Sequence, residues 1–113
     1  MRRDLRVYLW DALTAADHII DFTRGKIGED YKDDLLLRSA VERQFEIIGE
    51  ALNQLTRVSP DLATQVPELA RIIVFQNIIV HGYAIVDNDI VWGVVQDDLP
   101  VLRDALQRLL DDA

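Results

Sequence analysis

Cysteine is absent from the 113-residue sequence, which excludes a disulfide framework and any metal site built on thiolates. Histidine occurs only twice, so a histidine-rich metal site is not expected either. Glycine-rich phosphate loops, nucleophile elbows and HExxH zinc motifs are also missing. We therefore expect a protein that uses no metal and no cofactor.

Long apolar runs are missing as well. A signal peptide needs an unbroken apolar core, but Asp4, Asp11 and Asp17 interrupt the first part of the chain. No uncharged stretch is long enough to cross a bilayer. Together with the lack of cysteine, which fits a reducing compartment, these patterns indicate a soluble, cytoplasmic protein without membrane contact.

Positive charge is scarce, because 12 Lys and Arg residues stand against 20 Asp and Glu residues, a formal net charge of −8. General attraction to phosphates therefore cannot drive binding to nucleic acid, and any RNA contact must use local basic residues. Arg2, Arg3 and Arg6 form one cluster, and Arg38 and Arg43 form a second. Taken alone, each cluster is more simply explained as a solvated helix face.

Aromatic residues make up only 7% of the chain and glycine and proline are few, whereas half of the residues are hydrophobic. This composition favours helices, and the length suits one domain spanning residues 1–113. Two stretches repeat apolar residues at spacings of four and three, the pattern of a helix that buries one face. One stripe comprises Leu5, Leu9, Ala12, Ala16 and Ile19, and the other comprises Leu37, Val41, Phe45, Ile48, Leu52 and Leu55.

Breaks between the expected helices are marked by glycine, proline and polar residues. Gly25 should end the first helix, and "KIGEDYKDD" reads as a polar connector to the second, which should close at Ser59 and Pro60. A last helical region should start after the N-cap candidates Asp87, Asn88 and Asp89. Pro100 is expected to kink or divide that region.

The segment between these regions contains the run "VFQNIIVHGY", residues 74–83. Its β-branched residues would also suit a strand, but the distance from Pro67, expected in the first helical turn, to Gly82, expected as the C-cap, favours a helix. This helix is apolar nearly all round, with Val74, Phe75 and Ile78 opposite the main apolar arc. A second copy of the chain would cover that face, which predicts a homodimer; the alternative is a central helix in a monomer.

Polar residues interrupt this apolar segment. Gln76 falls inside the main arc, where an unpaired amide would cost roughly 1–3 kcal/mol, so it should find partners or line a cleft. Asn77 and His81 are four residues apart and share one side of the helix. His81 suits proton transfer near neutral pH but equally suits capping of the last helical carbonyls. Tyr83, just past Gly82, is expected on a loop, either as a reactive hydroxyl or as a packing aromatic.

The phrase Gln76-Asn77-x-x-x-His81-x-Tyr83 resembles the signature of the HEPN superfamily, and most closely that of HepT-type toxins, which carry arginine at the first position. Similarity also covers "ERQFEIIGEAL" (42–52) and "IVWGVVQDDLPVLR" (90–103). The resemblance implies an all-α, up-and-down bundle of four to five helices that forms a homodimer. It also implies metal-independent cleavage of RNA, with tRNA as the expected target, at a site shared by two copies.

The same resemblance assigns roles to single residues. His81 would act on the ribose 2′-hydroxyl or the leaving oxygen, Asn77 would orient the reacting groups, and the signature arginine would hold the phosphate. The implied partner is a nucleotidyltransferase antitoxin of the MntA type, which silences the toxin by transferring AMP to Tyr83.

Gln76 departs from the signature, because a neutral amide lacks the charge and the bidentate fork of arginine. Loss of such a contact commonly costs about 10²–10³ in rate. Arg71 lies about 15 Å along the same helix from His81, so only an arginine of another copy would compensate. Gln76 thus signals a weakened toxin, an engineered change, or a non-catalytic helical dimer that only binds its nucleotidyltransferase partner.

Overall fold

The computed structural model describes residues 1–81 and 87–112; residues 82–86, residue 113 and the side chain of His81 lie outside this part. The described residues form seven α-helices and one π-helix, so the expected all-α class is confirmed. In chain order these are α1 (Arg3–Thr23), α2 (Gly28–Asp33), α3 (Leu35–Val58), α4 (Pro60–Ala63), α5 (Leu69–His81), α6 (Asn88–Gly93), the π-helix η1 (Val94–Asp98) and α7 (Leu99–Asp111).

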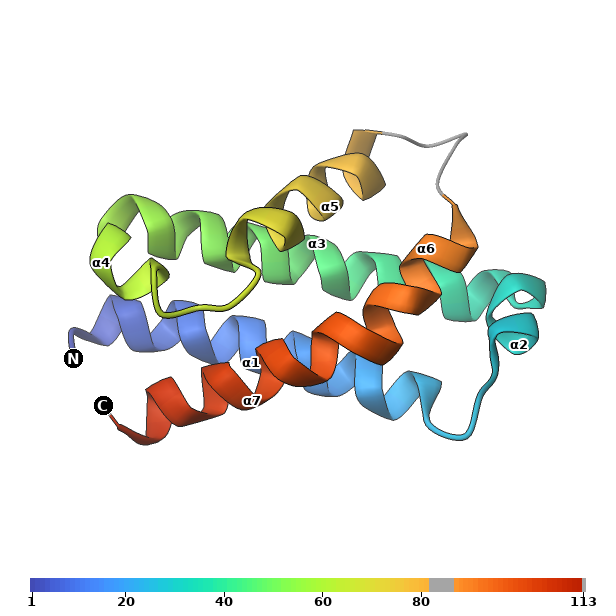
Figure 1. The fold of residues 1–113 in the computed structure, drawn as a ribbon, viewed down its shortest axis with the longest axis horizontal. Coiled ribbons are helices and arrows are strands. Elements are labelled where there is room, and N and C mark those ends of the chain that lie inside the picture. The colour runs from blue at the N-terminus through green and yellow to red at the C-terminus, as the bar shows by residue number, and fades with distance from the viewer. Residues whose placement is uncertain (82–86, 113) are drawn as a thin grey trace.

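The longest helices, α1 and α3, lie side by side and form the centre of the bundle, and α7 returns along α1 (Figure 1). Every residue of the two apolar stripes recognised in the sequence is buried, which confirms both faces. Arg103 of α7 reinforces the packing on α1, because its Nε donates a hydrogen bond to Asp17 Oδ1 at 2.8 Å. The start of α1 and the end of α7 lie at the same end of the bundle (Figure 1).

Helix α5 crosses α3 and lies beside the α6–η1 segment that leads into α7 (Figure 1). The β-branched run lies within α5, so the prediction that it forms a helix and not a strand is confirmed. Ile72 and Ile79 are buried in the α3–α5 contact. Phe45 of α3 meets Phe75 of α5 edge to face, with ring centroids 5.0 Å apart, an arrangement that aromatic pairs favour. This contact holds the signature segment on the bundle.

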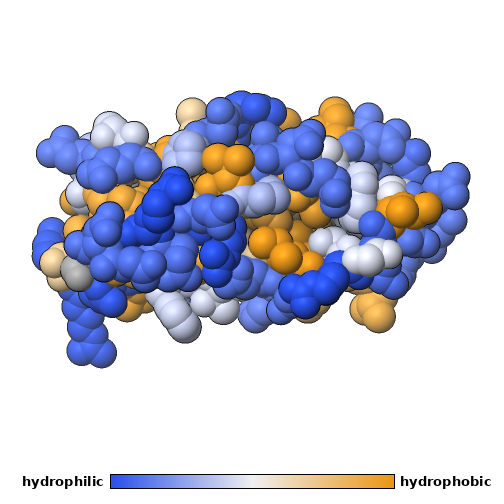
Figure 2. All heavy atoms as spheres, turned by 60° about the horizontal axis from the view of Figure 1, so that its bottom comes forward, coloured by the Kyte–Doolittle hydropathy of each residue, from blue (hydrophilic) through white to orange (hydrophobic). Residues whose placement is uncertain are grey.

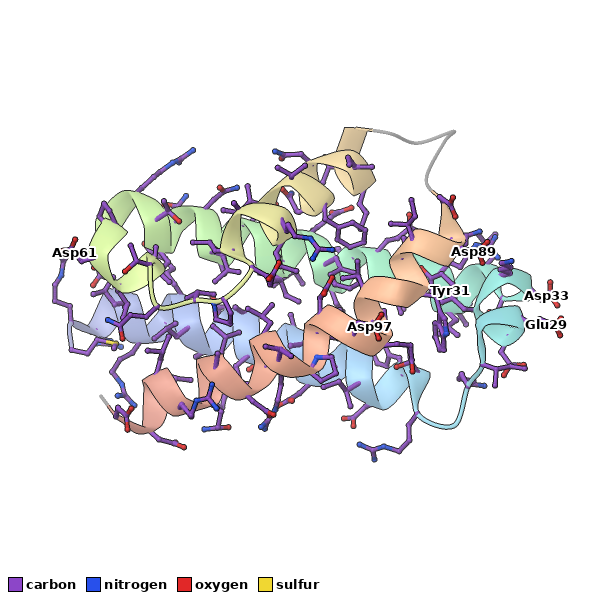
Figure 3. All side chains as sticks on the ribbon, viewed as in Figure 1. Glu29, Tyr31, Asp33, Asp61, Asp89 and Asp97 are labelled. Carbon is purple, nitrogen blue, oxygen red and sulfur yellow. The ribbon has the colours of Figure 1, made fainter. Side chains whose placement is uncertain are left out.

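The segment between α1 and α3 was predicted to be a polar connector without a helix of its own. This prediction is wrong in one respect, because the segment contains the short helix α2. Tyr31 explains why the segment folds back: its ring is fully buried and packs on Trp92 of α6, with centroids 5.6 Å apart. Lys32 adds an ion pair of 2.7 Å to Asp89, at the first turn of α6. Figure 3 shows Tyr31 pointing from α2 toward α6, with Asp89 close by.

The expected start of the third long helix is also corrected. Pro67 does not occupy the first turn of α5, which begins at Leu69. Glu68 adopts a left-handed conformation with φ of 60°, so the chain turns there before the helix starts. The expected stop at Gly25 is confirmed, since α1 ends at Thr23 and Gly25 has a φ of 74° that favours glycine.

The last helical region starts and divides as expected. The Asp87 side chain accepts hydrogen bonds from the backbone N–H groups of Asp89 and Ile90, and thereby caps α6. The π-helix η1 divides the last helical region between α6 and α7, and it ends at Asp98, two residues before Pro100. A wider π turn at this point relieves the backbone before a residue that cannot donate a helical hydrogen bond.

Within the described ranges, no helix has the length and apolarity needed to cross a membrane. The face in Figure 2 is mostly hydrophilic, and hydrophobic side chains reach its surface in separate spots.

Candidate functional site

Helix α5 presents Gln76 to α3, where the side chain is only 6% exposed. Gly49 of α3 faces it and leaves the space that the glutamine side chain fills. The Oε1 atom of Gln76 is buried without a hydrogen-bond partner among the described residues. Of the two alternatives, that this amide finds partners or lines a cleft, the first is not met for its oxygen among the described residues, because the neighbouring glycine supplies no donor side chain.

Asn77, the next signature residue, is exposed and points away from the α3 contact. His81 is the last residue of α5, four positions further along the helix. Its side chain lies outside the described part, as do the expected C-cap Gly82 and the expected modification site Tyr83. The structure thus brings Gln76 and Asn77 to the second half of α5, but Gln76 is buried against α3 whereas Asn77, about 100° further round the helix, is exposed.

The face of α5 opposite Gln76 carries exposed apolar side chains. Val74 is 58% exposed and Ile78 is 52% exposed, and Ile90 at the start of α6 is 60% exposed beside them. A hollow of about 370 Å³ lies between α5 and the α6–η1 segment. Its lining is mainly apolar and comprises Ala70, Arg71, Ile72, Val74, Phe75, Ile78, Ile90, Val94 and Asp98.

Arg71 stands at the rim of this hollow. Its guanidinium reaches Glu68 at 3.2 Å and Asp98 at 3.3 Å, but its side chain remains 68% exposed. Solvent screens such pairs, so they hold the arginine only loosely. At about 100° per residue, Arg71, Val74, Ile78 and backbone position 81 fall within an arc of about 80° on α5.

Arg71 is the one basic residue in the lining of this hollow, and sequence reasoning set it aside because of its distance from His81 within the chain. The signal that would have singled it out is its spacing. Residues 71, 74 and 78 recur at intervals of three and four, so the arginine continues the same exposed helix face as the apolar pair.

The family model for the HepT-like group, described as ribonuclease HepT-like, matches residues 12–109. A probable ribonuclease HepT of Thermococcus cleftensis is 33% identical over 96% of this chain and 98% of its own length. A putative RNase of Methanocaldococcus jannaschii is 29% identical over 90% of this chain and 93% of its own length.

A second M. jannaschii protein, named as both a gamma-glutamylcyclotransferase and a putative RNase, is 30% identical over 99% of this chain. The chain spans only 50% of that relative. No solved structure gives a significant match. The extent of the family match, together with the signature placed on α5, confirms the resemblance read from the sequence, and the chain belongs to the HepT-like ribonuclease family.

Proposed function

We propose that this chain is the toxin of a toxin–antitoxin pair, a metal-independent endoribonuclease that acts on RNA, with tRNA as its target, as a homodimer joined across α5. The single observation that carries the proposal is the exposed apolar pair Val74 and Ile78 on the helix that bears the signature. Association through this face covers apolar surface that the single chain leaves in water. The names of the relatives support RNA as the substrate class.

A two-fold axis perpendicular to α5 and centred between Val74 and Ile78 sets the register of this dimer. Each Val74 then packs on Ile78 of the second copy. Because the two α5 helices run in opposite directions, Arg71 of one copy lies opposite position 81 of the other. The 15 Å that separate these positions along one helix, at about 1.5 Å per residue, no longer keep the arginine away from the site.

This register supplies the charge that Gln76 lacks. His81 accepts the proton of the ribose 2′-hydroxyl as its oxygen attacks phosphorus; the bond to the 5′ oxygen then breaks, and the imidazolium returns the proton to that oxygen, which leaves a cyclic phosphate and a free 5′-hydroxyl. Arg71 of the second copy holds the phosphate oxygens, on which negative charge develops. Exposed Asn77 lies beside the arc that faces the second copy, where its amide orients the substrate. No step in this scheme needs a metal ion.

Cleavage is tested with purified protein, tRNA and a chelator. The expected products carry a cyclic phosphate and a free 5′-hydroxyl, and His81→Ala should abolish them. Arg71→Ala should lower the rate by about 10²–10³, the usual loss for one electrostatic donor. Full activity of His81→Ala would overturn the assignment of the proton acceptor.

The register is tested separately from activity, because the natural chain contains no cysteine. Chains carrying Arg71→Cys and chains carrying His81→Cys are mixed and oxidised. We expect a disulfide-linked pair only when both variants are present, since each engineered thiol lies opposite the other position. Cross-linking of Arg71→Cys with itself would contradict the antiparallel register.

The nucleotidyltransferase antitoxin of the MntA type is proposed to silence the toxin by joining AMP to Tyr83. Tyr83 follows the end of α5 by two residues in the sequence. An added nucleotide at that point would obstruct the site and introduce a negative phosphate where RNA must bind. Mass spectrometry after co-expression should find one or more AMP groups on the natural chain and none on Tyr83→Phe.

A second candidate function is a non-catalytic dimer that only binds the nucleotidyltransferase. The burial of neutral Gln76 favours it, because this side chain holds α5 on α3 and offers no charge to a phosphate. That candidate predicts tight binding of the antitoxin without RNA cleavage, even in Gln76→Arg. Cleavage by Gln76→Arg that disappears in the double variant with His81→Ala would exclude it.

A further inference from the structure

The first turns of α1 carry a cluster of cationic and aromatic side chains that the α5 site does not use. Arg3, Arg6, Val7 and Trp10 follow one another at intervals that place them on one face of the helix. Together with Leu110 of α7 they line a hollow of about 250 Å³. We call the three residues Arg3, Arg6 and Trp10 the α1 cluster.

The two arginines of the α1 cluster are available to a ligand. Arg2 Nη2 donates a hydrogen bond to Asp4 Oδ2 at 2.8 Å. The acidic side chain closest in sequence to Arg3 and Arg6 therefore already has a basic partner. Among residues 1–81 and 87–112, neither Arg3 nor Arg6 forms an ion pair, and both side chains are exposed. In a chain of net charge −8, a polyanion is repelled over most of the surface and attracted to a local group of this kind.

Among the described residues, Trp10 does not belong to the buried core. Its side chain is 60% exposed, whereas Trp92, the other tryptophan, is half-buried against Tyr31. An indole on the surface beside two guanidinium groups presents a flat face on which a nucleobase stacks. The arginines on the preceding turns are placed to hold the phosphates on either side of that base.

We propose that the α1 cluster binds a single-stranded segment of RNA, with one base stacked on Trp10 and the neighbouring phosphates held by Arg3 and Arg6. The choice of RNA rests on the proposed function. The choice of a single strand rests on the exposed indole, because bases in a duplex are already stacked on each other and do not offer a free face. The partner chemistry is therefore an unpaired base flanked by phosphates.

The first turns of α1 lie at the end of the bundle that carries the N-terminus, whereas α5 runs away from that end and stops beyond the middle of the bundle (Figure 1). The bundle is 42 Å long, so one RNA must extend along much of it to reach both places. Binding at the α1 cluster would then add affinity without touching the reacting atoms. Its loss should raise KM and leave kcat unchanged.

The test measures binding in the His81→Ala background, so it does not depend on cleavage. The affinity is measured from the fluorescence anisotropy of a dye-labelled short oligouridylate, quenching of tryptophan emission is followed in the same titration, and a duplex RNA of the same length is titrated in parallel. We expect quenching by the single strand only. Trp10→Ala should weaken binding roughly 5- to 150-fold, the range for loss of one stacked base.

The arginines are tested with a double variant and a matched control. Arg3→Ala with Arg6→Ala should weaken binding and lower the slope of log affinity against log salt by about 1.4, as expected for two single-strand phosphates. Arg24→Ala with Lys26→Ala removes the same charge beyond the other end of α1 and should change neither quantity.

Unaltered affinity of Trp10→Ala, equal quenching by duplex RNA, or no binding of the oligouridylate at all would overturn the proposal. A change in oligomeric state of Trp10→Ala, measured by light scattering, would instead assign the indole to a contact between copies and would likewise overturn it. Proteins that bind the oligouridylate but never cleave RNA would refute the proposed function and leave the α1 cluster intact.

Discussion

Gln76 of α5 lies over Gly49 of α3 so closely that a Cβ atom on the glycine would be 2.5 Å from Gln76 Cβ and 2.7 Å from Gln76 Cδ. The missing side chain of Gly49 therefore sets the distance between the signature helix and the core helix. This contact connects the stability of the fold to the position of α5.

Gly49→Ala should lower the melting temperature. The added methyl group forces α5 outward, at a cost of roughly 1–3 kcal/mol for overpacking, which exceeds the gain of up to about 1 kcal/mol from replacing a helical glycine. Gly93→Ala is the matched control, because a Cβ there meets no atom within 4 Å. We expect thermal unfolding to show a loss for the first variant and a gain or no change for the second.

Gln76→Met should stabilise the protein. Methionine fills the same unbranched space over Gly49 and removes the buried Oε1 acceptor, whose unmade hydrogen bond costs about 1–3 kcal/mol. Urea unfolding measures the change in the free energy of unfolding. A marked decrease in that free energy would mean that the amide oxygen has a partner in solution.

Ile78→Lys should separate the proposed dimer into single chains. An ammonium group placed in the apolar contact between two α5 helices would lose its hydration, at a cost of several kcal/mol. Val101→Lys, at a residue of α7 that is 53% exposed, is the control and should leave the mass unchanged. Light scattering during size-exclusion chromatography distinguishes the two results.

Glu42→Gln should change how stability depends on pH. Burial raises the pKa of Glu42 above its usual 4.5, an effect that Arg38 partly opposes. The folded state therefore holds this proton more tightly than the unfolded chain, and stability falls as the pH rises through the window above 4.5. The variant should melt higher than the natural chain at about pH 7 and show no such gain at about pH 3.5, where the carboxyl is protonated in both states. Exposed Glu50→Gln should melt like the natural chain at both pH values.

Tyr31→Phe should leave stability unchanged or increase it. The ring is fully buried, and its hydroxyl has no hydrogen-bond partner among the described residues. Burial also raises the pKa of this hydroxyl, so it stays neutral under ordinary conditions. Tyr31→Ala should instead cost roughly 3–5 kcal/mol, because it removes the packing against Trp92. A large loss in Tyr31→Phe, measured by chemical unfolding, would reveal a hydrogen bond to the hydroxyl.

The long helices could be predicted because each buries a regular apolar stripe. Leu9, Phe45 and Leu52 show this clearly: their spacing alone placed them inside, and the structure leaves none of them exposed. The exposed second face of α5 was foreseen for Val74 and Ile78, which fall opposite the buried arc, but the placement of Phe75 on that face was wrong, because Phe75 packs on Phe45 of α3.

Contacts between segments distant in sequence could not be predicted in the same way. Helix α2 has too few residues for a periodic pattern, and only the packing of Tyr31 on Trp92, sixty-one positions later, explains it. The same holds for Gln76 and Gly49, whose relation depends on how two helices cross. Periodicity reports which face of a helix is inside, but it does not report which residue of another helix meets that face.

The start of α1 and the end of α7 lie close to the same end of the bundle, which has a practical consequence for every experiment above (Figure 1). An affinity tag, a fluorescent reporter or a surface anchor joined before α1 or after α7 would start near the first turn of α1 and away from the last described turn of α5. Cleavage assays would tolerate such additions, whereas titrations that follow Trp10 need untagged protein.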